Sequence, residues 1–83
     1  METEEFVTGD LYLSAAIISL LDINPSFKTE KNLVLFVFPV STELYKAVNS
    51  YYNGISINAY GYAQTIKKLR TEMIIRKNKV LGE

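Results

Sequence analysis

Leu33-Val34-Leu35-Phe36-Val37-Phe38 is an unbroken apolar run that Pro39 ends, and it decides the fold class of this chain of 83 residues. Four of its six residues are β-branched or aromatic, which is typical of a strand. Successive side chains of a strand point to opposite faces, and both sets are apolar here. We therefore expect a strand that is covered on both faces. The stretch Ile23–Lys28 is its expected hairpin partner, and the polar residues 29–32 are the expected turn.

The chain before this hairpin is predicted to form a helix that begins near Thr8 or Asp10, because either side chain can cap it. Residues 11–21 are apolar on nearly every side of a helical wheel, which is typical of a buried helix. In so small a protein, such burial needs a sheet with further helices, or a second copy of the chain. One edge of the hairpin is likewise expected to pair across a dimer or with a short strand at Phe6-Val7.

Two further helices are predicted after the strand. Ser41 caps the first of them, and Asn53-Gly54 ends it in a left-handed conformation. Ser56 or Asn58 caps the last and longest helix. Its apolar stripe consists of Ala59, Tyr62, Ala63, Ile66, Leu69 and Met73. The predicted fold is a small α+β domain with the order helix–β-hairpin–helix–helix, in which residues 1–83 form a single domain.

The composition excludes several classes of site. The chain has no histidine and no cysteine, which excludes ordinary zinc sites, disulfides and thiol or Ser-His nucleophiles. Its carboxylates are scattered over the N-terminal segment, helix ends and a turn, so none is expected to belong to an acid–base pair. The four glycines are scattered as well, so the sequence has no phosphate-binding loop. We therefore expect no enzyme, no cofactor and no metal.

Neither export nor a membrane span is predicted. The first residues, Met1-Glu2-Thr3-Glu4-Glu5, are acidic, whereas a signal peptide begins with basic residues. The longest apolar stretch, Leu11–Leu21, is about half as long as a membrane helix, and serines interrupt it. We expect a soluble protein of the cytoplasm that has no membrane partner.

The charges of the chain are segregated, although its formal net charge is zero. The segment Met1–Asp22 holds five acids and no base, and residues 1–7 form an acidic N-terminal segment. Residues 67–83 form a basic helix end and tail. Six bases there are candidate contacts for the phosphates of DNA or RNA: Lys67, Lys68, Arg70, Arg76, Lys77 and Lys79. On a helical wheel these bases surround the helix, which is typical of a helix whose last turns leave the protein body.

Two other interpretations of the basic segment stay open. Bases near a helix C-terminus suit the helix dipole, and Glu72 with Arg76 forms a favourable pair, so the segment is also typical of a solvated helix end. An acidic protein partner is attracted by the same charges, and the N-terminal segment of another copy is one such partner.

Aromatic residues supply a second candidate surface. Most of the six tyrosines fall at the margins of apolar stripes, where we expect them to border the core. Tyr60 and Ile75 instead fall on the polar side of the last helix. These two residues are therefore candidate contacts for a protein partner.

Three motifs resemble those of a small uncharacterised domain family from bacteria, phages and other mobile elements. Residues 6–16 are similar to the family's F-x-T-x-D-L-Y-L-A-A-like first helix, residues 34–38 to its V-x-F-V-F-like strand, and residues 51–54 to its Y-Y-N-like turn. The resemblance covers Phe6 to about Leu69; it departs at Ser14, where alanine is usual, and in a longer basic tail. It implies a fold and a mobile-element setting, and it carries over no functional residue.

The expected function is that of a small non-enzymatic binding protein of phage or mobile-element type. Its basic C-terminal helix is expected to contact nucleic acid or a nucleoprotein. The alternatives are a protein-binding inhibitor or adaptor, for example against a host factor, and a plain homodimerisation module. DNA or RNA, a second protein and a second copy of the chain are thus the partners left open.

Overall fold

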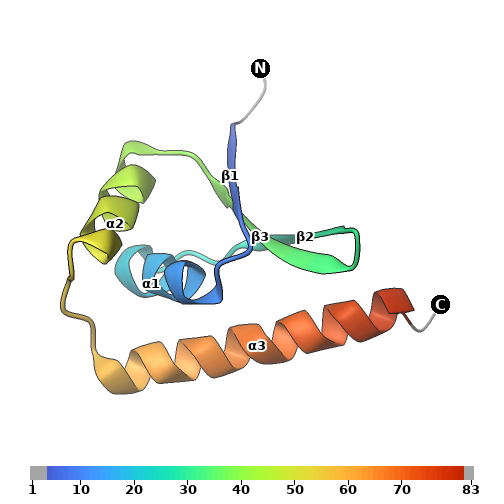
Figure 1. Ribbon diagram of the computed structural model, residues 1–83. Coiled ribbons are helices and arrows are strands. Elements are labelled where there is room, and N and C mark those ends of the chain that lie inside the picture. The colour runs from blue at the N-terminus through green and yellow to red at the C-terminus, as the bar shows by residue number, and fades with distance from the viewer. Residues whose placement is uncertain (1–3, 82–83) are drawn as a thin grey trace.

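The strands and helices of the protein follow the predicted order. The computed structural model describes residues 4–81, with side chains for residues 4–78. Within these residues, the elements are β1 (Glu5–Thr8), α1 (Leu11–Leu21), β2 (Ser26–Glu30), β3 (Leu33–Pro39), α2 (Thr42–Tyr52) and α3 (Ala59–Leu81) (Figure 1). The strands form an antiparallel sheet in the order β1-β3-β2. The predicted α+β fold is confirmed, and the segment at Phe6-Val7 adds β1 to the hairpin within the same chain.

A two-residue turn at Lys31 and Asn32 joins β2 to β3. Both residues are left-handed, with φ values of 50° and 67°, which is the turn conformation that matches the natural twist of two paired strands. β2 begins only at Ser26, so the expected hairpin partner Ile23–Lys28 was wrong in its bounds. The reason is Pro25, which has no backbone N–H to give to a strand ladder.

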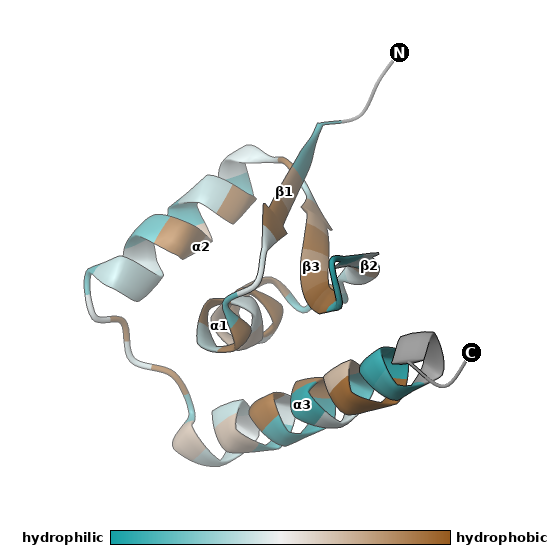
Figure 2. Cartoon of the chain, turned by 45° about the vertical axis from the view of Figure 1, so that its right-hand side comes forward, coloured by the Kyte–Doolittle hydropathy of each residue, from teal (hydrophilic) through white to brown (hydrophobic). Residues whose placement is uncertain are grey.

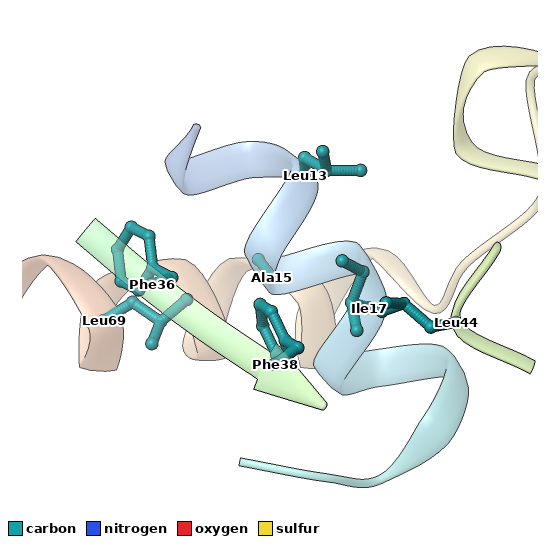
Figure 3. Packing of buried hydrophobic residues seen from close by; sticks show 7 residues of the cluster. All are labelled: Leu13, Ala15, Ile17, Phe36, Phe38, Leu44 and Leu69. Carbon is teal, nitrogen blue, oxygen red and sulfur yellow. The ribbon is translucent and has the colours of Figure 1, made fainter. Parts of the chain in front are cut away.

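The hydrophobic core lies on one face of the sheet, and all three helices contribute to it. The register of the strands pairs Phe6 with Phe38 and Phe27 with Phe36, so these rings share one face. Figure 3 shows Phe36 and Phe38 pointing from β3 toward α1. The buried cluster consists of Leu13, Ala15, Ile17, Phe36, Phe38, Leu44 and Leu69. β3 is therefore the strand on which α1, α2 and α3 are assembled.

The opposite face of the sheet is partly open, so the expectation that β3 is covered on both faces is wrong. Leu33 is 62% exposed and Val7 is 40% exposed. On the same face Leu35 is half-buried, and Val37 is buried at the centre of the sheet. Figure 2 shows the apolar colour of β3 continuing to the hairpin end. Apolar side chains on both faces of a strand did not require two covering layers, because exposed apolar surface is common in folded proteins.

α1 packs between the other two helices, since it contacts both α2 and α3. Asp10 caps it by accepting a hydrogen bond of 3.0 Å from the backbone nitrogen of Leu13. Residues 13–17 are buried, whereas Tyr12 and Leu20 are exposed. The predicted burial of this helix on every side is confirmed for its middle and wrong for its ends.

α2 and α3 begin where local sequence predicts. The Ser41 hydroxyl accepts a hydrogen bond of 3.0 Å from the Leu44 nitrogen, and Asn58 Oδ1 accepts one of 2.7 Å from the Gly61 nitrogen. Of the two predicted caps, Ser56 and Asn58, it is therefore Asn58 that caps α3. Gly54 follows α2 with a φ of 79°, as expected for a left-handed stop. Among residues 4–81, none of the helices combines the length and the apolar character that crossing a bilayer requires.

Candidate binding surface along α3

α3 is the longest described element, with 23 residues, and it carries the predicted basic segment. It runs beneath α1 and continues along the β2–β3 hairpin (Figure 1). Leu69 is 4% exposed and belongs to the core cluster, while Tyr62, Ile66 and Met73 pack against that cluster. This apolar stripe fixes the rotation of α3 about its axis, and so it decides which flank each base occupies.

Three bases lie on one flank of α3, which we call the basic flank: Lys67, Arg70 and Lys77. At about 100° per residue they fall within about 80° of arc, and all three side chains are exposed. Lys67 and Lys77 lie about 15 Å apart along the helix axis. Glu72, the acid of α3, lies on the other flank. The basic flank therefore presents positive charge without a neutralising carboxylate from its own helix.

Lys68 and Arg76 lie away from the basic flank and near Glu72. Arg76 Nη2 is 3.4 Å from Glu72 Oε1, and the Arg76 guanidinium carbon is 4.0 Å from the centre of the Phe27 ring on β2. Lys68 lines a hollow together with Phe27 and Glu72. Arg76 thus connects α3 to strand β2 of the hairpin. The expectation that the last turns leave the protein body is therefore wrong at least as far as Arg76.

Two predicted charged segments extend past the described side chains. The side chain of Lys79, the sixth predicted base, lies outside them, although its backbone belongs to α3. Residues 1–3 of the acidic N-terminal segment also lie outside the described residues, and the side chains of Glu4 and Glu5 are exposed.

A groove of 420 Å³ opens between the basic flank and β3, and we call it the α3–β3 groove. Its apolar lining residues come from both elements: Leu33, Leu35, Met73 and Ile74. Arg70 and Lys77 are the charged residues among its described lining, and Gly9 lies in it just past the end of β1. The structure thus brings two of the six predicted bases together around an apolar floor, which the sequence did not indicate.

Tyrosines join α1 to α3 beside the groove. The Tyr62 hydroxyl donates a hydrogen bond of 2.9 Å to the backbone carbonyl of Tyr12, and Arg70 Nη2 lies 3.4 Å from the Tyr12 hydroxyl. Burial raises the pKa of Tyr51 and of Tyr62 above the usual value of about 10. Tyrosine hydroxyls are already protonated at neutral pH, and burial keeps these two protonated to higher pH, which suits the donor role of Tyr62.

The predicted protein-contact residues, Tyr60 and Ile75, are 74% and 55% exposed. They lie about 22 Å apart along the helix axis, so the structure does not bring them into one patch. Ile74 was missed by the prediction, although it is exposed and lines the α3–β3 groove. The signal that could have found it is the pair Ile74-Ile75 directly before Arg76 and Lys77.

The other tyrosines divide into two groups. Tyr51 and Tyr62 pack against the core cluster, as predicted for residues at the margins of apolar stripes. Tyr12, Tyr45 and Tyr52 are between 49% and 68% exposed, so the same prediction is wrong for them. A position at the margin of an apolar stripe does not decide burial, because the tyrosine hydroxyl is readily solvated.

Among the described residues, no three acidic side chains lie close enough together to hold a metal ion. No protein-family model, curated protein or solved structure matches the chain. The resemblance to a mobile-element domain family therefore stays a prediction.

Proposed function

We propose that this protein is a non-enzymatic binding module, an adaptor or inhibitor that takes an acidic segment of a partner protein in the α3–β3 groove. One observation carries the proposal: an apolar floor is bordered by Arg70 and Lys77, with no carboxylate among the described lining residues. Such a groove favours a ligand that offers acidic and apolar side chains together. The mobile-element setting implied by the family resemblance makes a host protein the partner to look for.

Nucleic-acid binding through α3 is the second candidate function. Lys67, Arg70 and Lys77 share the exposed basic flank, and attraction to phosphates needs charge more than regular spacing. The structure reduces the set of predicted bases, because Arg76 is engaged by Glu72 and Phe27. Four described bases then remain for a polyanion, namely Lys67, Lys68, Arg70 and Lys77, and two of them border an apolar groove. We therefore place a protein ligand first.

Capture from native host lysate, with and without nuclease, separates the two candidates. The wild-type chain is compared with the variant R70E/K77E and with the matched control K31E/K46E, which makes the same charge change in the turn and on α2. A protein that survives nuclease, binds the control and is lost from R70E/K77E supports the proposed function. A partner that R70E/K77E retains contradicts it.

The remaining alternatives have their own measurements. A gel shift with single- and double-stranded DNA and RNA tests the nucleic-acid candidate, whose complexes should weaken steeply between about 50 and 200 mM salt. No complex at low salt rejects it. A homodimerisation module requires a mass above the 9.4 kDa of one chain, which light scattering measures.

A further inference from the structure

β3 has an open backbone edge beside the α3–β3 groove. β1 pairs with β3 only from Phe36 to Pro39, because the chain leaves the sheet after Thr8 and enters α1. On its other side, β3 pairs with β2 along residues 33–37. Within the described residues, Val34 therefore has a neighbouring strand on one side and none on the other.

The turn determines which way the backbone groups of Val34 point. Glu30 and Leu33 are paired next to a two-residue turn, and such a pair exchanges both of its hydrogen bonds. Antiparallel ladders alternate, so the N–H and C=O groups of Val34 point away from β2 and toward the open edge. Phe36 points its groups the same way, and there β1 lies opposite. An unpaired edge of this kind is a template for another strand.

The open edge and the groove coincide. Val34 lines the groove together with Arg70, Met73 and Lys77 of α3. Gly9 lies at the same place, where β1 has ended. The groove thus continues the line of β1 along β3, past the point at which the chain itself turns away.

We propose that the acidic segment of the partner binds as an added β-strand, which pairs with Val34 and extends the line of β1. The inference rests on the proposed function, since it states how the acidic segment would lie in the α3–β3 groove. Strand addition supplies affinity through main-chain hydrogen bonds, while flanking side chains supply specificity. Here those flanking groups are the apolar floor and the two bases.

The dimensions of the groove agree with a short strand. Arg70 and Lys77 are about 10 Å apart along the axis of α3. Three residues of an extended chain span about 10 Å as well. Acidic side chains at alternate positions of such a segment share one face and lie about 7 Å apart, so they reach the two long basic side chains while the backbone lies against Val34.

The charge part of the inference is tested with a defined probe, a fluorescent six-residue peptide of alternating glutamate and valine with blocked ends. Its control has lysine in place of glutamate. Fluorescence anisotropy at low salt should show that wild type binds the glutamate peptide at least tenfold more tightly than the lysine peptide. R70E/K77E should reverse this order, and K31E/K46E should keep it. Absence of any preference for glutamate overturns the inference together with the acidic groove.

The strand part is tested with N-methylated probes, because substitution of the buried Val34 risks unfolding the sheet. One peptide is N-methylated on its glutamate backbone nitrogens and the other on its valine backbone nitrogens. Each peptide therefore lacks the N–H donors along one of its two edges, and both keep every charge. One of the two should bind at least tenfold more weakly, and the Val34 amide should exchange more slowly in the complex with the parent peptide.

Equal binding by the parent and both methylated peptides overturns the added strand and leaves the acidic groove standing. The capture experiment tests the groove separately, so the two failures are distinguishable. Peptide binding that disappears as the protein concentration rises would show that a second copy of the chain pairs with the open edge of β3. That result also overturns the inference.

Discussion

The guanidinium of Arg76 on α3 lies 4.0 Å above the centre of the Phe27 ring on β2. The same group is 3.4 Å from Glu72, one helical turn earlier. Arg76 therefore joins the C-terminal half of α3 to the edge strand of the hairpin. This contact distinguishes the bases: Arg76 is held by Glu72 and Phe27, whereas Arg70 and Lys77 border the α3–β3 groove, where Arg70 also donates a hydrogen bond to the Tyr12 hydroxyl.

Substitution of Arg76 tests that distinction. R76A removes the contact with the ring and a half-exposed ion pair, so we expect it to lower the free energy of unfolding by about 1 kcal/mol. Its affinity for the glutamate peptide should be unchanged. R70A should do the reverse, with lost affinity and a stability within about 0.5 kcal/mol of wild type. Urea denaturation and anisotropy measure the two effects, and an R76A variant that keeps its stability but loses the peptide contradicts the assignment.

Tyr62 provides a second attachment of α3, through its hydrogen bond of 2.9 Å to the Tyr12 carbonyl on α1. Y62F removes only the hydroxyl, so the expected loss in the free energy of unfolding is about 1 kcal/mol. Y60F is the matched control, because the Tyr60 side chain is 74% exposed. Thermal denaturation compares the two variants with wild type. Equal stability of Y62F and Y60F would mean that water hydrogen-bonds to the Tyr12 carbonyl as favourably as the Tyr62 hydroxyl does.

The parts of the fold that the sequence predicts are those with local causes. Asp10, Ser41 and Asn58 cap their helices by accepting a hydrogen bond from a backbone nitrogen three residues later, so the signal lies within one turn of chain. The contact of Arg76 with Phe27 has no such local signal. It depends on how α3 crosses β2, which only the packed core determines.

The candidate site was predictable only in its charges. The sequence identifies Arg70 and Lys77 as bases, but the flank that they occupy follows from the packing of Leu69 and Met73 against the core. The open edge at Val34 depends on where β1 stops pairing, which is a property of strand register. Register is set by tertiary pairing, so no reading of the single apolar run could supply it.

The raised pKa values of Tyr51 and Tyr62 predict a loss of stability at high pH. Burial is the main cause of both shifts. In the unfolded chain these tyrosines ionise near pH 10, whereas the folded chain holds their protons to higher pH. Their stabilising contribution is therefore complete below about pH 10 and is lost as the pH rises through the raised pKa values.

Melting temperatures measured from neutral pH to about pH 11 test this expectation, with the decline beginning near pH 10. The variant Y51F/Y62F should decline less steeply than wild type. The control Y45F/Y60F removes two exposed hydroxyls and should keep the wild-type slope. If all three proteins decline in parallel, other groups cause the loss at alkaline pH.

Ser14 on α1 is fully buried, and its Oγ has no hydrogen-bond partner among the described residues. A buried hydroxyl without a partner costs about 1–3 kcal/mol, so S14A should raise the free energy of unfolding by about 1 kcal/mol. S19A is the matched control on the same helix: Ser19 is exposed, and its Oγ donates to the Ala15 carbonyl at 2.9 Å. Its stability should stay within about 0.5 kcal/mol of wild type. Urea midpoints at an unchanged slope measure both variants. If S14A is less stable than wild type, the Ser14 hydroxyl has a hydrogen-bond partner in solution. The buried side of α1 then contains a polar contact that the described packing lacks.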